Sequence, residues 1–155
     1  MVHLEILEKV EIFRDLDDRR LGAVGGCCTE AAFQRGEEIF KVGEEARHLW
    51  AVAEGRVKLV SGSNSTLEEK EVSEGRVFGW PSLLKNRTYR FSAICAARSA
   101  RVIRIDAGCL QALFEEDPLL GYKVMSGLVV VIGDHFHQLQ EEVVKRRGQD
   151  MMNQW

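Results

Sequence analysis

The sequence has little that would suit a metal centre or a membrane span. Its four cysteines form no Cys-x-x-Cys pair, and Cys27 and Cys28 would point about 100° apart on a helix. We therefore expect reduced thiols and no metal site, with Cys95 and Cys109 buried in apolar surroundings. No apolar run reaches the roughly 20 residues that cross a bilayer, and the acidic opening MVHLEILEKVEIF argues against a signal peptide. A cytoplasmic protein without a membrane partner is expected.

The chain also lacks the basic charge of a nucleic-acid binder and the usual residue sets of an enzyme. Its formal net charge is −3, which disfavours binding to a phosphate backbone. No Ser-His-Asp set, P-loop or catalytic pair of carboxylates can be placed, so we do not expect an enzyme. His135 and His137 fall two residues apart on a predicted helix, where their side chains point roughly 200° apart and cannot chelate one metal.

Only two prolines accompany fourteen glycines, and this balance favours a turn-rich β fold. Short apolar runs such as EEIFKVG, HLWAVAEG and RVKLVSG are punctuated by glycine, which takes positive φ freely. We predict one domain over residues 1–147, followed by a tail, 148–155. It would comprise N-terminal helices over 1–30, a β-roll over 31–106 and C-terminal helices over 107–147. Asp106 is predicted to cap the first C-terminal helix.

A long helix with an apolar seam is predicted from Leu119 to about Arg147. The seam consists of positions that step by four, four, three and four, namely Leu128, Ile132, Phe136, Leu139 and Val143. Such a seam packs either on its own domain or on a second copy of the chain. We favour the second copy, and hence a homodimer, because GLVVVIG is apolar on nearly all sides and needs cover on more than one.

The order of these parts resembles the cyclic nucleotide-binding domain, in particular the sensory half of the Crp/Fnr regulators. The resemblance rests on the segments EIFRDL, FxxGEEIFKVGE, LWAVAEGRVKL and GRVFGW, on an arginine ten residues after Trp80, and on the long final helix. It implies an eight-stranded antiparallel jelly roll with flanking helices, dimerised through the last helix. Fewer than twenty residues follow Val143, which is too few for a helix-turn-helix, so DNA binding by this chain is not expected.

The phosphate-binding cassette of that family falls on FGWPSLLKNRTYRFSA, from Phe78 to Ala93. Gly79 and Arg90 match the family positions, and a helix start after Gly79 would offer backbone N–H groups to an anion that the arginine clamps. The resemblance implies cyclic AMP, cyclic GMP or another small anion as the effector. The expected ligand-binding residues are Gly79, Trp80, Pro81, Ser82, Leu83, Arg90, Phe91 and Ser92.

Trp80 departs from the family pattern, because it stands where a glutamate normally accepts from the ribose hydroxyl. A lost hydrogen bond to a charged group would weaken a cyclic nucleotide by roughly tenfold to hundredfold. Trp80 and Phe91 either line the site for a different ligand or fill it. In the second case the chain is a ligand-free interaction or scaffold protein with a vestigial cassette. Arg90, in turn, either holds an anion, faces water or pairs with one of the hairpin carboxylates Glu68, Glu69 and Glu71.

Overall fold

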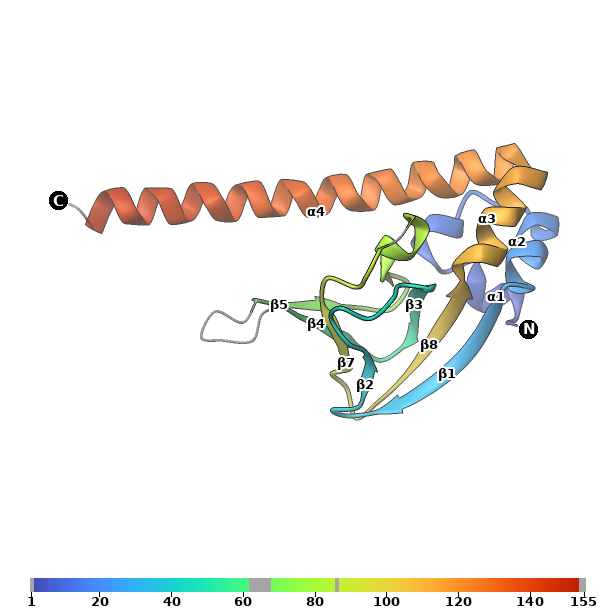
Figure 1. Ribbon diagram of the computed structural model, residues 1–155, viewed down its shortest axis with the longest axis horizontal. Helices are drawn as coiled ribbons and strands as arrows, with labels where there is room; N and C mark the ends of the chain where they lie inside the picture. Colours follow the sequence, from blue (N-terminus) through green and yellow to red (C-terminus); the bar gives the residue numbers. More distant parts are fainter. Residues whose placement is uncertain (1, 62–67, 86, 154–155) are drawn as a thin grey trace.

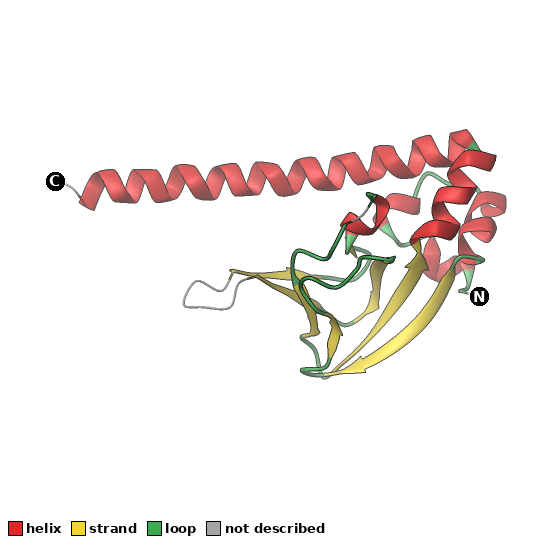
Figure 2. Cartoon of the chain, viewed as in Figure 1, coloured by secondary structure: helices red, strands yellow, loops and turns green. Residues whose placement is uncertain are grey.

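The computed structural model describes residues 2–61, 68–85 and 87–153, and places a β-roll beneath one long helix (Figure 1). Short helices gather at one end of the roll, where the long helix begins (Figure 2). The helical elements are α1 (Leu4–Leu7), η1 (Glu11–Phe13), α2 (Asp18–Gly25), η2 (Trp80–Leu83), α3 (Ala107–Glu116) and α4 (Pro118–Asn153). The polar segment SGSNST, which its composition marks as a hairpin tip, falls almost wholly on residues 62–67, outside the described part of the chain.

Two four-stranded antiparallel sheets form the roll. The strands are β1 (Cys28–Gln34), β2 (Glu38–Phe40), β3 (His48–Glu54), β4 (Val57–Ser61), β5 (Glu68–Val72), β6 (Val77–Phe78), β7 (Ser92–Cys95) and β8 (Ser99–Asp106). One sheet has the order β1-β8-β3-β6 and the other β2-β7-β4-β5. The prediction of an eight-stranded antiparallel jelly roll with flanking helices is confirmed for the described residues.

The central strands β3 and β8 contribute buried residues to both faces of the sheet, and in β3 this explains why HLWAVAE reads as a continuous apolar run. On one face, Leu49 and Ile105 join a core shared with the N-terminal helices, α3 and α4. On the other face, Trp50 and Val102 join a second core inside the roll. The first sheet therefore separates two hydrophobic cores.

Aspartates begin both C-terminal helices. Asp106 ends β8 and accepts a hydrogen bond from the backbone N–H of Cys109 at 2.8 Å, so the predicted cap of α3 is confirmed. Asp117 accepts from the N–H of Leu120 at 3.2 Å at the start of α4. Pro118 occupies the first position of that helix, where its missing N–H costs nothing.

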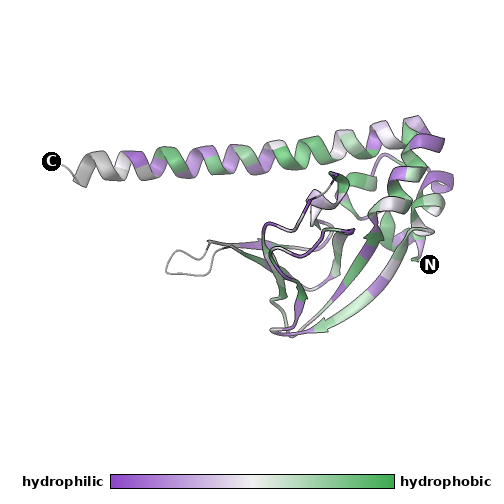
Figure 3. Ribbon diagram, in the orientation of Figure 1, coloured by the Kyte–Doolittle hydropathy of each residue, from purple (hydrophilic) through white to green (hydrophobic). Residues whose placement is uncertain are grey.

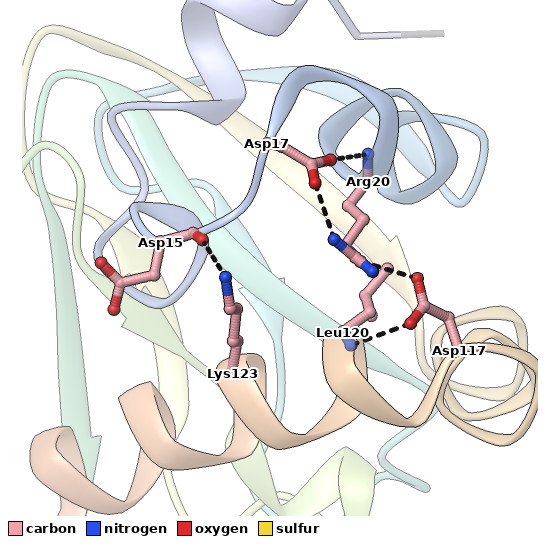
Figure 4. Close-up of polar contacts among 6 residues, drawn as sticks. All are labelled: Asp15, Asp17, Arg20, Asp117, Leu120 and Lys123. Carbon is pink, nitrogen blue, oxygen red and sulfur yellow. Dashed lines mark hydrogen bonds and ion pairs between the residues drawn. The ribbon is translucent and has the colours of Figure 1, made fainter.

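A polar junction ties the start of α4 to the N-terminal helices (Figure 4). Arg20 of α2 contacts Asp17 at 2.6 Å and Asp117 at 2.8 Å. The ammonium of Lys123 donates to the backbone carbonyl of Asp15 at 3.1 Å. The hydrogen bond from Arg20 lowers the pKa of the Asp117 carboxyl. These contacts fix the direction in which α4 leaves the domain.

The prediction that all four cysteines are reduced is wrong for two of them. Cys27, beside β1, forms a disulfide with Cys109 in the first turn of α3, with the two Cα atoms 5.6 Å apart. Cys28 and Cys95 are free and buried. The pair was missed because its members are 82 residues apart and only the fold brings them together. The argument from reduced thiols to a cytoplasmic location no longer holds, and that location stays a prediction.

Helix α4 is longer than predicted, since it continues past Arg147 to Asn153. By length and composition alone, its portion Pro118–Lys145 is apolar enough to cross a membrane, although no uninterrupted apolar run does so. The helix carries alternating hydrophobic and hydrophilic bands (Figure 3). Leu120, Val124 and Leu128 lie in the core of the domain. That burial is also what a helix packed on a globular domain requires, so composition alone assigns no membrane role.

Candidate functional site

Gly79 holds the turn that begins the predicted cassette. It follows β6, has φ of 76°, and precedes the four-residue 3-10 helix η2. A Cβ at this position would lie 2.9 Å from Cδ1 of Trp50 and 3.2 Å from Cε1 of Tyr89. Both the left-handed backbone and the close approach of the two rings therefore require glycine.

Ser82 is bonded within the turn rather than turned toward a ligand. Its side chain is buried, and its hydroxyl donates to the carbonyl of Gly79 at 2.8 Å. Its backbone N–H donates to the same carbonyl at 3.2 Å. The backbone N–H of Ser82 was expected to donate to an anion, but in the structure it donates within the turn.

Arg90 is exposed and lines a cavity of about 950 Å³. Tyr89, just before it, is anchored because its backbone N–H donates to the carbonyl of Glu44 at 3.0 Å. Of the three carboxylates proposed as partners of Arg90, Glu71 pairs with Arg56 at 3.2 Å. The other two have side chains outside the described part of the structure, and Arg90 makes no ion pair with the side chains that are described.

The remaining cassette residues divide between structural contacts and the cavity wall. Trp80 and Leu83 are partly buried against the core formed with the helices, and Trp80 also lines the cavity. Pro81 and Phe91 line it too. Ser92 accepts a hydrogen bond from the backbone N–H of Val42 at 3.0 Å. Of the predicted ligand-binding residues, five border the cavity, namely Gly79, Trp80, Pro81, Arg90 and Phe91, whereas Ser82, Leu83 and Ser92 do not.

An aromatic cluster fills the interior of the roll behind the cassette. Phe40 stacks on Tyr89 with ring centres 3.7 Å apart, and Trp50 and Phe78 complete the cluster. The Tyr89 hydroxyl accepts from the indole N–H of Trp50 at 3.1 Å and donates to the carbonyl of His48 at 2.9 Å. Burial raises the pKa of Tyr89. This cluster could not be recognised from local sequence patterns, because its members come from four separate segments.

A cavity of about 950 Å³ separates the cassette from α4. Its walls come from Phe40, Phe78 and Tyr89 of the aromatic cluster, from β5 and the turn after it, and from residues 131, 132, 134–139 and 141 of α4. Glu11 contributes a nearly buried carboxylate, which accepts from the N–H of Val77 at 2.8 Å and pairs with Arg76 at 3.1 Å. The site is therefore an apolar, aromatic hollow with charged groups at its edges, suited in size to a small planar molecule.

One polar contact joins the two sides of this cavity. Lys70 of β5 and Nδ1 of His135 on α4 are in hydrogen-bond contact, and both side chains are partly buried. Desolvation lowers the pKa of both groups, and the Lys70 ammonium lowers that of His135 further. Neither residue was singled out as a ligand contact from the sequence. Among the described residues, no group of three or more histidine, cysteine or acidic side chains could hold a metal ion.

Comparisons with known proteins agree with this architecture. Residues 30–117 match the family model described as the cyclic nucleotide-binding domain. A solved protein of Geobacter metallireducens GS-15, classed as cyclic nucleotide-binding, is 29% identical, with a TM-score of 0.74 over 85% of this chain and 96% of that one. The catabolite activator protein of Thermus thermophilus shares the fold at 20% identity, with a TM-score of 0.69 over 84% of this chain and 62% of that one.

A longer protein is also similar. A protein of Rhodopseudomonas palustris classed as a potassium channel is 25% identical over 149 residues, which is 96% of this chain. This chain spans only 35% of the length of that relative.

Proposed function

Because the chain belongs to the cyclic nucleotide-binding domain family, we propose that it is a regulatory module that binds a small anionic ligand between its cassette and α4. Members of this family are regulatory binding domains rather than enzymes. Cyclic AMP and cyclic GMP are the first ligands to consider. Ligand binding repositions α4 and thereby signals to a partner. Neither DNA nor a membrane is proposed as a partner of this chain.

The observation that carries the proposal is the placing of Arg90, Gly79 and Trp80 on one wall of a cavity whose other wall is α4. An exposed guanidinium at the edge of an aromatic hollow suits a ligand with a planar ring and an anionic group. A ligand in this position would touch both the roll and the helix, so it would favour one placement of α4 over others.

Isothermal titration with cyclic AMP, cyclic GMP and simple organophosphates tests this proposal. We expect binding by the unaltered protein and a loss of roughly tenfold to hundredfold in affinity in Arg90→Ala, because a charge-assisted contact is removed. Arg87→Ala is the matched control, since Arg87 is also exposed in this loop but borders a separate hollow of about 310 Å³. Equal affinity in Arg90→Ala and the unaltered protein would refute the role of Arg90.

A ligand-free interaction or scaffold protein is the second candidate. It is favoured by the packing of Trp80 on the helical core and by the four aromatic rings inside the roll. In that case the cassette is vestigial, and none of the titrated compounds produces heat. The same experiment therefore separates the two candidates.

We propose that the chain forms a homodimer through α4. Leu128, part of the predicted seam, is only 3% exposed and packs in the chain's own core, so it is not available to a second copy. Apolar residues on the neighbouring face step alternately by three and four, which is the pattern of a coiled coil. They are Tyr122, Met125, Val129, Ile132, Phe136, Leu139 and Val143, and we call this set the α4 seam. Ile132 also packs partly on the core of the chain, and Ile132, Phe136 and Leu139 also border the cavity. Four of them, spaced seven apart, are at least half exposed: Tyr122, Val129, Phe136 and Val143.

A further inference from the structure

Lys70 occupies an inward-facing position of the β-roll. Val57 and Val72 lie directly opposite each other on β4 and β5, and both are buried. Lys70 is two residues before Val72, so its side chain leaves the same face of the sheet. Its cross-strand neighbour is Leu59, whose other neighbour is the fully buried Ala93. A lysine thus stands in a row of otherwise apolar, inward-facing residues and borders the cavity.

His135 holds this lysine from the opposite wall. The ammonium of Lys70 donates to Nδ1 of His135, which must be unprotonated to accept. The lowered pKa of His135 keeps the ring neutral near pH 7. Glu142 of α4 carries charge near both groups, and Glu11 and Arg76 carry charge near Lys70. An ammonium has three donors, so two remain for another acceptor at this end of the cavity.

The register separates this contact from the cassette. Lys70, Leu59 and Ala93 form one row across three strands, so the backbone of Lys70 is about 9.5 Å from that of Ala93. Arg90 precedes Ala93 by three residues, outside that row. The two cations therefore come from different segments, and both border the cavity together with Leu59. A ligand that contacts both residues would place its anionic group at Arg90 and its ring at Lys70.

We propose that Lys70, positioned by His135, selects the ring of the ligand and prefers a 6-oxopurine to a 6-aminopurine. This inference rests on the proposed function, since it concerns the same cavity. Guanine presents two neighbouring acceptors, O6 and N7, whereas adenine pairs the N7 acceptor with an amino donor. An ammonium group only donates hydrogen bonds, so it can donate to both O6 and N7 of guanine. In adenine it would meet the amino group, which is also a donor. Lys70 therefore distinguishes the two purines by whether the edge of the ring offers two hydrogen-bond acceptors or an acceptor and a donor.

Titration of three cyclic mononucleotides into Lys70→Met and the unaltered protein tests this assignment. We expect the unaltered protein to bind cyclic GMP roughly tenfold to hundredfold more tightly than cyclic AMP. Cyclic IMP, which keeps O6 and N7 but lacks the 2-amino group, should follow cyclic GMP. In Lys70→Met the affinity for cyclic GMP should fall to that for cyclic AMP, whereas the affinity for cyclic AMP should change little. Lys58→Met is the matched control, because Lys58 lies on the same sheet and points to its opposite face.

The outcomes distinguish this inference from the proposed function. If cyclic GMP and cyclic AMP bind equally, or Lys70→Met keeps the preference, the selection by Lys70 is refuted while ligand binding stands. If cyclic IMP follows cyclic AMP, selection at O6 is refuted without reliance on any variant. If no cyclic nucleotide binds the unaltered protein, the selection by Lys70 is refuted, whereas the proposed function fails only if the organophosphates do not bind either. Arg90→Ala should weaken all three nucleotides by a similar factor, because it acts on the shared phosphate.

Discussion

Tyr89 combines a stacking contact with two side-chain hydrogen bonds inside the roll. Its ring stacks on Phe40, while its hydroxyl satisfies both the indole N–H of Trp50 and the carbonyl of His48. Only 4% of the residue is exposed, so water cannot replace these bonds. The same ring closes the space around Gly79. One phenol thus supports the turn of the cassette and the wall of the cavity.

Removing the hydroxyl in Tyr89→Phe should lower the free energy of unfolding by about 1–3 kcal/mol, because two buried polar groups lose their partner. Urea denaturation followed by circular dichroism measures the change. Tyr122→Phe serves as the control, since Tyr122 is 71% exposed and its substitution should have little effect on a monomer. Equal stability of Tyr89→Phe and the unaltered protein would show that the hydroxyl contributes nothing net.

Sequence reasoning reached residues on one wall of the cavity and none of the polar residues on the other wall. Gly79 and Arg90 were placed because the spacing between them follows a family pattern along the chain. Lys70 and His135 were missed because strand register and the direction of α4 decide whether they meet, and neither follows from local periodicity. Ser82 was assigned to the ligand, but its hydrogen bonds stay within the turn.

At the scale of elements, α4 has one apolar face that packs on the domain and another that is exposed. Val124 and Leu128 pack on the domain, whereas Val129 and Phe136 are 64% and 61% exposed. The sequence predicted a single seam that begins at Leu128. In the structure the exposed apolar face lies further around the helix, on the side of Val129, which is about 100° from Leu128. The predicted and proposed seams share Ile132, Phe136, Leu139 and Val143.

Two adjacent valines provide a matched test of the α4 seam. Val129 lies in the seam and is 64% exposed, and Val130 lies about 100° around the helix and is 63% exposed. We expect Val129→Asp to dissociate the dimer, because it places a carboxylate opposite its own copy in an apolar contact. Val130→Asp should leave the dimer intact. Sedimentation at micromolar concentration measures both, and a monomeric unaltered protein would overturn the proposal.

At the scale of the whole molecule, the disulfide joins the two ends of the β-roll sequence. Cys27 comes before β1 and Cys109 comes after β8, so the covalent loop encloses all eight strands of the described structure. Composition and periodicity predicted a turn-rich β fold correctly, because glycine turns and apolar strands are local signals, and the jelly roll itself was expected from the resemblance to the cyclic nucleotide-binding domain. The disulfide was not predictable in this way, because it depends on where β1 and α3 meet.

Reducing this bond should lower the free energy of unfolding by about 2–4 kcal/mol, because the unfolded chain gains the freedom of a long open loop. Urea denaturation with and without a dithiol reductant measures the difference. In the double variant Cys27→Ser and Cys109→Ser the reductant should have no effect. Alkylation of the unreduced, unfolded protein should modify only Cys28 and Cys95. Modification of all four cysteines would contradict the disulfide.

The two-sided burial of β3 and β8 has a consequence for the way the molecule opens. Helices cover one face of these strands and the roll interior covers the other, and both strands are central in their sheet. Separation of α4 exposes one face only, and opening of the cavity exposes the other. Partial opening on either side therefore leaves the β3–β8 ladder intact, and its amide protons should be the last to exchange with solvent.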